Sequence, residues 1–144
     1  MRARVSAYGI AVERRADGDH LLLTRLSGAS PVFGPGLWHL PGGGIDPGEQ
    51  PDAALAREFH EETGRGLRDA RLLEARTYAA HRLGVTWHLV ALFYRAGLVP
   101  GPLRITETDG STADLAWLPL ADLDPSALTP PTRDAVAALR SGRW

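Results

Sequence analysis

Residues 40–64, LPGGGIDPGEQPDAALAREFHEETG, place three consecutive glycines before a segment with the marks of a short helix. Pro51 suits the first turn of a helix, Asp52 suits its positive N-terminal end, and Gly64 is a natural C-terminal stop. We therefore predict a loop at the glycines and a helix over residues 51–63. The helix is rich in carboxylates although the formal net charge of the chain is only −1.

Three carboxylates of this helix are predicted to share one side, Glu58, Glu61 and Glu62. Because an α-helix turns by about 100° per residue, they fall within an arc of about 100°. The arc borders the predicted apolar face, which is made by Leu55, Ala56 and Phe59. Like charges one turn apart repel by a few tenths of a kcal/mol, so we expect a cation against them. Oxygen ligands suit Mg²⁺ or Mn²⁺, which often bridge to substrate phosphates. The alternative is a solvated acidic face with local partners.

Composition narrows the classes of protein that fit. Hydrophobic residues at 44% and charged residues at 23% are typical of a globular protein, so we expect one domain over residues 1–144. The absence of cysteine excludes disulfides, thiolate metal sites and a cysteine nucleophile. A near-neutral charge balance disfavours a nucleic-acid partner, and no apolar run approaches the roughly 18 residues of a membrane span. We expect a cytoplasmic monomer or homodimer that acts on a small molecule.

The hydropathy pattern predicts several strands and one further helix. It predicts strands over residues 4–13, 20–27, 37–40, 71–81, 85–96 and 114–120. The segment 85–96 is apolar on both faces, which is typical of a central strand covered on both sides. A second helix is expected from Thr129, a candidate N-cap, with Val136 and Leu139 on its buried side. The pattern therefore predicts six strands and, with the helix over residues 51–63, two helices.

The spacing of residues 43–65 resembles the Nudix box, Gly-x5-Glu-x7-Arg-Glu-aliphatic-x-Glu-Glu-x-Gly-aliphatic. Its fixed positions are matched by Gly43, Glu49, Arg57, Glu58, Glu61, Glu62 and Gly64. Phe59 stands at an aliphatic position, and Arg65 stands where an apolar residue is usual. The surrounding GLWHLPGG and the later AWLPLADL are also similar to this family. The resemblance implies a single-domain α/β/α sandwich around a mixed β-sheet.

The resemblance also implies a divalent-metal site with Mg²⁺, or Mn²⁺, as the cofactor. Glu58 and Glu62 would be the principal ligands, with Glu61 assisting directly or through water. The main chain at Gly42 and Gly43 would approach the metal or a phosphate closely, because no side chain intervenes.

The resemblance also implies residues that orient the metal-binding segment and a residue that acts as general base. Arg57 and Glu49 would pair and orient the loop and the helix. A general base would come from the box or from a later loop, where Glu107 is our choice, with Asp109 and Asp114 as alternatives. Solvated loop charges are the competing explanation for these last three residues.

Arg25 and Trp38 are weaker candidates for substrate binding. Arg25 lies where many family members place an arginine that contacts phosphate, and Trp38 could stack on a base. Surface charge for Arg25 and a core or edge position for Trp38 are the competing explanations.

The implied activity is divalent-metal-dependent hydrolysis of a nucleoside diphosphate linked to another group, X. By size and elimination, we expect a MutT-type enzyme acting on (deoxy)nucleoside triphosphates or related nucleotides. The alternatives are hydrolysis of nucleotide sugars or dinucleoside polyphosphates, and a Nudix-like module that binds a nucleotide without cleaving it. Isomerase chemistry on an isoprenoid diphosphate ranks last, because the acid-base cysteine of familiar relatives is absent.

Overall fold

A mixed four-stranded sheet forms one half of the β-structure. The computed structural model describes residues 1–144, and its first sheet has the order β5-β1-β7-β6. These strands are β5 (Gly42–Gly44), β1 (Arg2–Ile10), β7 (Val85–Leu98) and β6 (Leu67–Arg82). The pair β1 and β7 is parallel, whereas β5–β1 and β6–β7 are antiparallel. The mixed character expected from the family resemblance is confirmed.

A second sheet is built around one long strand and is antiparallel throughout. Its strands are β2 (Val12–Arg15), β3 (Gly18–Leu26), β4 (Trp38–His39) and β8 (Thr112–Pro119). Each of the other three strands pairs with β3. Ala11 separates β1 from β2, so the chain passes from the first sheet to the second at that residue.

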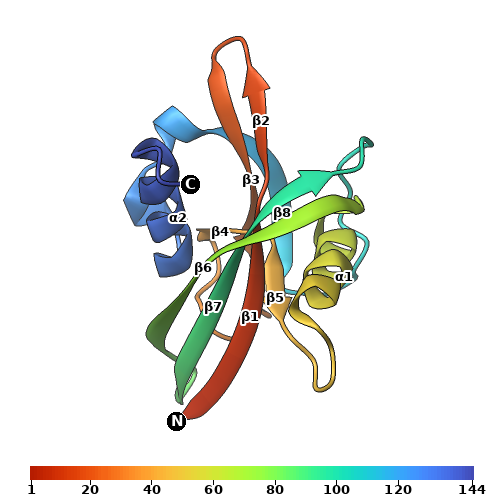
Figure 1. Ribbon diagram of the computed structural model, residues 1–144. Helices are drawn as coiled ribbons and strands as arrows, with labels where there is room; N and C mark the ends of the chain where they lie inside the picture. Colours follow the sequence, from red (N-terminus) through yellow and green to blue (C-terminus); the bar gives the residue numbers. More distant parts are fainter.

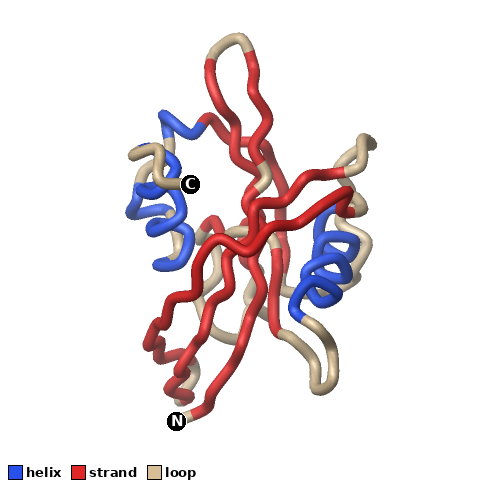
Figure 2. Tube along the Cα trace, viewed as in Figure 1, coloured by secondary structure: helices blue, strands red, loops and turns tan.

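Two helices cover the strands from opposite sides, as Figure 1 and Figure 2 show. They are α1 (Pro51–Thr63) and α2 (Pro130–Arg140), and two short 3-10 turns, η1 (Leu120–Asp122) and η2 (Pro125–Ala127), lead into α2. On the α2 side, Ile10, Leu89 and Phe93 pack with Val136 in the larger core. On the α1 side, Leu55 and Phe59 pack in a smaller core, which also includes Ala7, Leu22 and Tyr94. This is the predicted α/β/α sandwich.

Sequence and structure agree on both helices and on most strands. The helix predicted over residues 51–63 has those bounds, and Gly64 ends it with φ of 73°. The second helix begins one residue after Thr129, whose hydroxyl bonds to Thr132 rather than to a helix N–H. The predicted loop at the three glycines is wrong, because Gly42–Gly44 is strand β5, paired with Ser6–Tyr8. Glycine lacks the side chain that marks a strand in a hydropathy pattern.

Two expectations about burial are corrected. Ala56 is exposed because the buried side of α1 is centred on Leu55, Phe59 and Glu62, and Ala56 lies about 100° away from that centre. The strand β7 lies between β1 and β6 as expected, but only one of its faces is covered along its whole length. Thr86 and His88, on the α1 side, are exposed because α1 does not extend over the start of β7. Neither helix is long and apolar enough to cross a bilayer.

Candidate active site

A cavity of about 380 Å³ lies between the C-terminal half of α1, the strand β5 and two loops. The loops are residues 27–37, between β3 and β4, and residues 99–111, between β7 and β8. Most residues selected from the sequence line this cavity, namely Gly42, Gly43, Arg57, Glu58, Glu61, Glu62 and Glu107. The fold therefore brings together residues that are up to 65 positions apart in the chain.

The glycines of β5 allow charged groups to approach the main chain. A Cβ atom added to Gly43 would lie 2.8 Å from Cδ and from Oε1 of Glu58. A Cβ atom added to Gly44, on the opposite face of the strand, would lie 3.0 Å from the guanidinium carbon of Arg4. Gly42 has φ of 138°, a conformation that side chains rarely allow. The triple glycine is thus a strand whose bare backbone separates a carboxylate from a guanidinium.

Glu62 is a buried carboxylate held in a fixed orientation. Its side chain comes from the inward side of α1, and the residue is only 3% exposed. One oxygen accepts a hydrogen bond from the Gly42 N–H at 3.2 Å, and the other accepts one from the Thr112 hydroxyl at 3.0 Å. Burial, and then the neighbouring charge of Glu58, raise the pKa of Glu62 well above its usual value.

Glu58 is a second carboxylate whose ionised form is destabilised by its surroundings. Burial is the main cause that raises its pKa, and the charge of Glu61 adds to the effect, while Glu62 and Arg57 act in the opposite direction. Two carboxylates that burial destabilises side by side are better accommodated when a cation lies between them.

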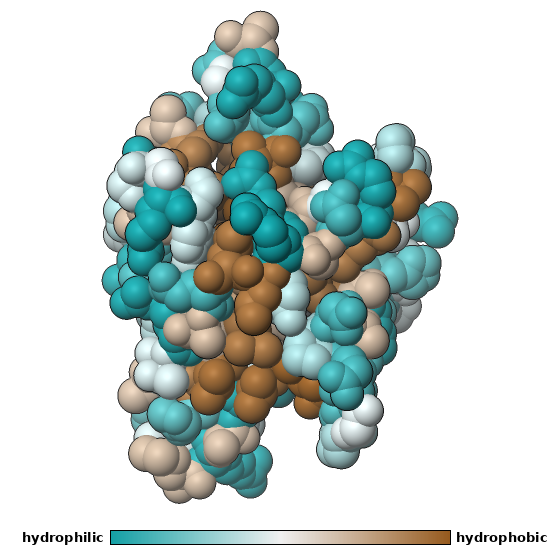
Figure 3. Space-filling model, viewed as in Figure 1, coloured by the Kyte–Doolittle hydropathy of each residue, from teal (hydrophilic) through white to brown (hydrophobic).

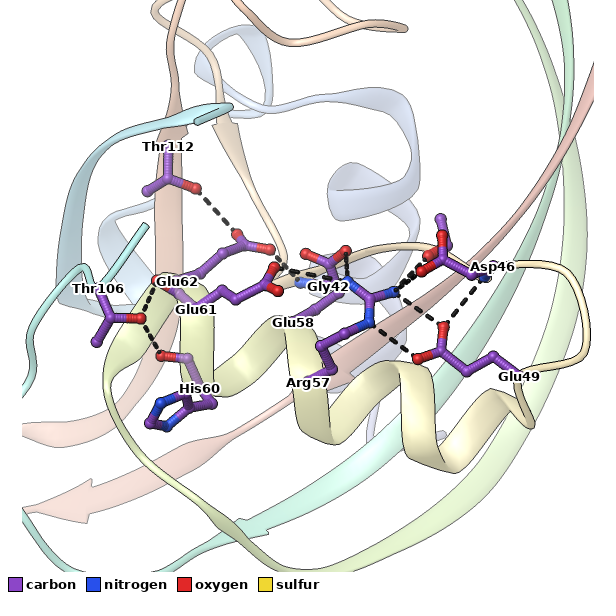
Figure 4. Close-up of polar contacts among 11 residues, drawn as sticks. Gly42, Asp46, Glu49, Arg57, Glu58, His60, Glu61, Glu62, Thr106 and Thr112 are labelled. Atoms are coloured by element: carbon purple, nitrogen blue, oxygen red, sulfur yellow. Dashed lines mark hydrogen bonds and ion pairs between the residues drawn. The ribbon is translucent and has the colours of Figure 1, made fainter. Parts of the chain in front are cut away.

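Arg57 joins the helix to the loop that precedes it (Figure 4). Its guanidinium donates two hydrogen bonds to Glu49, each 2.9 Å long, and further bonds to Glu58 at 3.0 Å and to the Gly44 carbonyl at 3.1 Å. The hydrogen bonds from Arg57 lower the pKa of Glu49 to about 2. Because a two-point contact fixes direction as well as distance, the pair holds β5, the loop and α1 in register.

These residues fit a divalent cation by their chemistry. Glu58 and Glu62 offer carboxylate oxygens of the kind that bind Mg²⁺, and the bare backbone of Gly43 lies against the Glu58 carboxylate. The structure contains no group of three or more acidic, histidine or cysteine side chains already converged at metal-binding distance. The fit therefore rests on donor type and on the raised pKa values of buried Glu62 and partly buried Glu58.

The loop that carries Glu107 is attached to the end of α1. The last carbonyl groups of a helix have no partner within it. Here the Thr106 hydroxyl and N–H both donate to the Glu61 carbonyl, at 3.1 and 2.8 Å, and the Glu107 N–H donates to it at 3.1 Å. Glu107 and Asp109 consequently line the cavity, whereas Asp114 does not.

Three residues considered from the sequence lie elsewhere. The Asp114 carboxylate is 3.6 Å from Arg25, and the Arg25 guanidinium lies over the Trp38 ring, 5.7 Å from its centroid. Trp38 also packs against the larger core. None of the three lines the cavity.

Sequence reasoning did not select Arg4, Tyr8 and His39, which also line the cavity. Arg4 and Tyr8 are on the same face of β1, and His39 contacts the edge of the Tyr8 ring with 4.7 Å between centroids. Burial raises the pKa of Tyr8 to about 12. A signal was present, since Arg4, Ser6 and Tyr8 put a polar group at every second position of an otherwise apolar strand.

His39 gives a prediction about the pH dependence of stability. Burial, and then the charge of Arg4, lower its pKa to about 3, and its Nδ1 lies 2.6 Å from the Thr129 hydroxyl. The unfolded chain binds a proton there below about pH 6.5, whereas the folded chain does not until about pH 3. Stability should therefore fall as the pH drops through this range, by at most roughly 1.4 kcal/mol per pH unit from this residue.

Melting curves of the wild type and of His39→Gln across this pH range test the point. The difference in free energy of unfolding between the two proteins should shift steadily against the wild type as the pH falls. Parallel pH profiles would show that His39 is not kept neutral by burial.

Comparison with known proteins agrees with this geometry. The family model of the NUDIX domain matches residues 3–139. A crystal structure of a MutT NUDIX hydrolase from Burkholderia pseudomallei is 33% identical, with a TM-score of 0.75, and the match covers 95% of this chain and 98% of that one. The chain therefore belongs to the Nudix family, as its box indicates.

Two further matches are more limited. The NUDIX domain of Shewanella oneidensis NrtR, solved in complex with ADP ribose, has a TM-score of 0.78 at 21% identity, covering 100% of this chain and 90% of that one. An RNA pyrophosphohydrolase from Photorhabdus laumondii is 49% identical over 41 residues, which are 28% of this chain and 23% of that protein. The first match supports the fold, and the second spans less than a quarter of its relative.

Proposed function

We propose that this protein hydrolyses a diphosphate linkage in a nucleoside diphosphate linked to another group, with divalent-metal dependence. The observation that carries the proposal is the buried carboxylate of Glu62 and the partly buried carboxylate of Glu58, which face a cavity beside the bare backbone of Gly43. A pyrophosphohydrolase activity is also supported by the relatives named RNA pyrophosphohydrolase and MutT. Nucleoside triphosphates are the first substrates to test, because no feature of the cavity requires a large group X.

The residues around the cavity divide the work of such a reaction. Glu58 and Glu62, with Glu61 beside them, would hold Mg²⁺ or Mn²⁺, and the bound cation would neutralise the diphosphate and polarise its phosphorus–oxygen bonds. Glu107 is our proposed general base, because it lines the cavity on a loop fixed to the end of α1. It would take a proton from the water whose oxygen bonds to phosphorus, while the bond to the bridging oxygen breaks and the leaving phosphate keeps that oxygen.

Arg57 and Glu49 would act through their neighbours. Their contacts run to each other, to Glu58 and to the Gly44 carbonyl, so their contribution is to hold the carboxylates in place. The positions of Arg25 and Trp38 outside the cavity give no support to a substrate role for them, and we assign them none.

A panel experiment tests the activity and identifies the substrate. Nucleoside triphosphates, nucleotide sugars and dinucleoside polyphosphates are incubated with the protein and Mg²⁺ in ¹⁸O-labelled water, and the products are analysed by mass spectrometry. Label in one phosphate-containing product identifies both the substrate and the phosphorus attacked. Calorimetric binding of a nucleotide that stays uncleaved for hours with Mg²⁺ would instead make the protein a binding module.

Arg4 is the natural contact for substrate phosphates. It lines the cavity, and unlike Arg57 it has no carboxylate within 4.0 Å, so its charge is available to a ligand. Arg4→Ala should raise KM for the best substrate about tenfold or more, the effect of losing one charge-assisted hydrogen bond, with a smaller change in kcat. Steady-state kinetics measure this, with Arg2→Ala on the same strand as the matched control. An unchanged KM in Arg4→Ala would contradict the assignment.

A further inference from the structure

A second cavity, of about 390 Å³, lies where the chain passes from β1 to β2. Its walls come from this junction, from the segment that follows α1, from the end of β7 and from β8. Figure 3 shows hydrophilic residues over the start of β6 and the end of β7, above α1 in this view. The second cavity shares no lining residue with the candidate active site, so the two are separate.

Arginine is the most frequent charged residue of the second cavity. Its charged lining consists of three arginines and two carboxylates, namely Arg65, Arg68, Arg95, Glu13 and Asp69. Both carboxylates already have a partner, since Glu13 is 2.9 Å from Arg15 and Asp69 is 2.9 Å from Arg68. Arg65 and Arg95 have no carboxylate within 4.0 Å. Two guanidinium groups without a counter-charge therefore line one cavity.

Arg65 is held in a fixed orientation at the second cavity. Its Nε donates a hydrogen bond to the Val99 carbonyl at 2.9 Å, and its guanidinium lies over the Trp117 ring, 6.0 Å from the centroid. A guanidinium has five N–H donors, and only this one is used within the protein. Arg65 also stands where the Nudix box has an apolar residue, so its charge is a feature of this chain. The remaining donors are free to bind an anion.

Arg95 has no polar partner for its side chain, although the residue is half-buried. Across the sheet it pairs with Arg71, which also has no carboxylate within 4.0 Å. Like charges at directly opposite positions of a sheet destabilise each other. Removing a charge from water also costs free energy unless another group replaces the water. An anion bound beside Arg95 would offset both costs.

We propose that the second cavity binds the phosphate group of a small anionic ligand, with Arg65 and Arg95 as its main contacts. The planar guanidinium keeps its charge at physiological pH, and its paired N–H donors match the oxygens of a phosphate. A volume of about 390 Å³ is within the range of small-molecule sites. Free phosphates and nucleotides share this group, and the experiment separates them. The proposal goes beyond the proposed hydrolysis, because it involves no metal and no active-site residue.

Isothermal titration calorimetry of the full chain without divalent metal gives the first test. Pyrophosphate, inorganic phosphate and AMP are titrated separately. At least one should bind saturably with a Kd of about 1 mM or tighter, the range that two charge-assisted contacts give. Arg65→Gln and Arg95→Gln should each weaken this binding about tenfold or more. The matched control is Arg14→Gln, which removes the same charge from a side chain that is 90% exposed and outside the cavity.

The comparison of the three ligands identifies the source of the phosphate group. Pyrophosphate or inorganic phosphate that binds at least as tightly as AMP would support a site for free phosphates. Tighter binding of AMP would support a nucleotide site. In either case the two arginine variants should lose affinity and Arg14→Gln should keep it.

Nuclear magnetic resonance of the labelled wild type locates the bound anion without any substitution, so the test does not depend on the folding of a variant. Titration should shift the backbone amide of Arg65 and the indole N–H of Trp117, and leave Gly42 and Glu62 unchanged. Absence of saturable binding for all three ligands would overturn the proposal. So would shifts confined to the active site, or full affinity in both arginine variants. None of these readouts depends on turnover, so a failure here is distinguishable from a failure of the proposed function.

Discussion

Glu62→Gln is expected to lower kcat by about 10³-fold or more on the best substrate. The substitution keeps the size of the side chain, and its amide oxygen can still accept the hydrogen bond from the Gly42 N–H. It removes the negative charge that we assign to holding the cation beside Glu58. The loss should therefore appear in turnover and in metal affinity, measured by steady-state kinetics and by titration with Mn²⁺.

The Glu62→Gln substitution should not lower the stability of the fold. In the wild type, burial and the Glu58 charge make the ionised form of Glu62 unfavourable, so a neutral amide relieves an existing cost. Without metal, the variant should melt no lower than the wild type. Glu13→Gln, a change of the same kind on the exposed strand β2, serves as the control and should leave kcat unchanged. A Glu62→Gln variant whose kcat stays within tenfold of the wild type would rule out the assigned role.

Gly42→Ala should have the largest effect on stability. The backbone of Gly42 has φ of 138°, and an added Cβ would overlap the Ala7 carbonyl oxygen and lie 2.8 Å from the Tyr8 Cα. These are main-chain atoms of the paired strand β1, which cannot move aside as a flexible side chain does. We expect a loss of about 3 kcal/mol or more, or a melting temperature lower by about 10 °C.

Two other glycines make this prediction specific. Gly28→Ala should be nearly neutral, because an added Cβ meets nothing within 4 Å and its φ is not positive. In Gly43→Ala the added Cβ would contact only the carboxyl end of the Glu58 side chain, which can move aside. The substitution should therefore reduce activity more than stability. If Gly42→Ala has the same melting temperature as the wild type, strand β5 does not pair with β1 as closely as described.

The fold was largely predictable because its signals are local. Pro51 and Gly64 bracket α1, and strand-length apolar runs marked the long strands. The short strand β5 could not be predicted in this way, since its three glycines pair through backbone alone with Ser6–Tyr8. The open start of β7 was also missed, because an apolar pattern such as that of Val90 and Leu92 does not say how far a helix extends over it.

The part of the candidate site that lies within one continuous segment, residues 43–64, could be predicted from the sequence. Helical spacing placed Glu58, Glu61 and Glu62 on one side of a helix, and the family resemblance implied the pairing of Glu49 with Arg57, because all of these residues lie on one loop and one helix. Residues supplied by distant strands were not found. The alternation of Arg4, Ser6 and Tyr8 marks a polar face on β1, but no local pattern records that β1 and β4 lie next to the glutamate helix in space and bring Arg4 and His39 to the cavity.

Metal dependence of turnover is the most direct test of the proposed function. The wild type is freed of metal with EDTA and assayed on nucleoside triphosphates and the other members of the panel, first without added metal and then with Mg²⁺ or Mn²⁺ restored. The expected result is no product beyond the uncatalysed background in EDTA, with phosphate-containing products appearing on addition of the cation. Hydrolysis that continues at the same rate in EDTA would contradict the account.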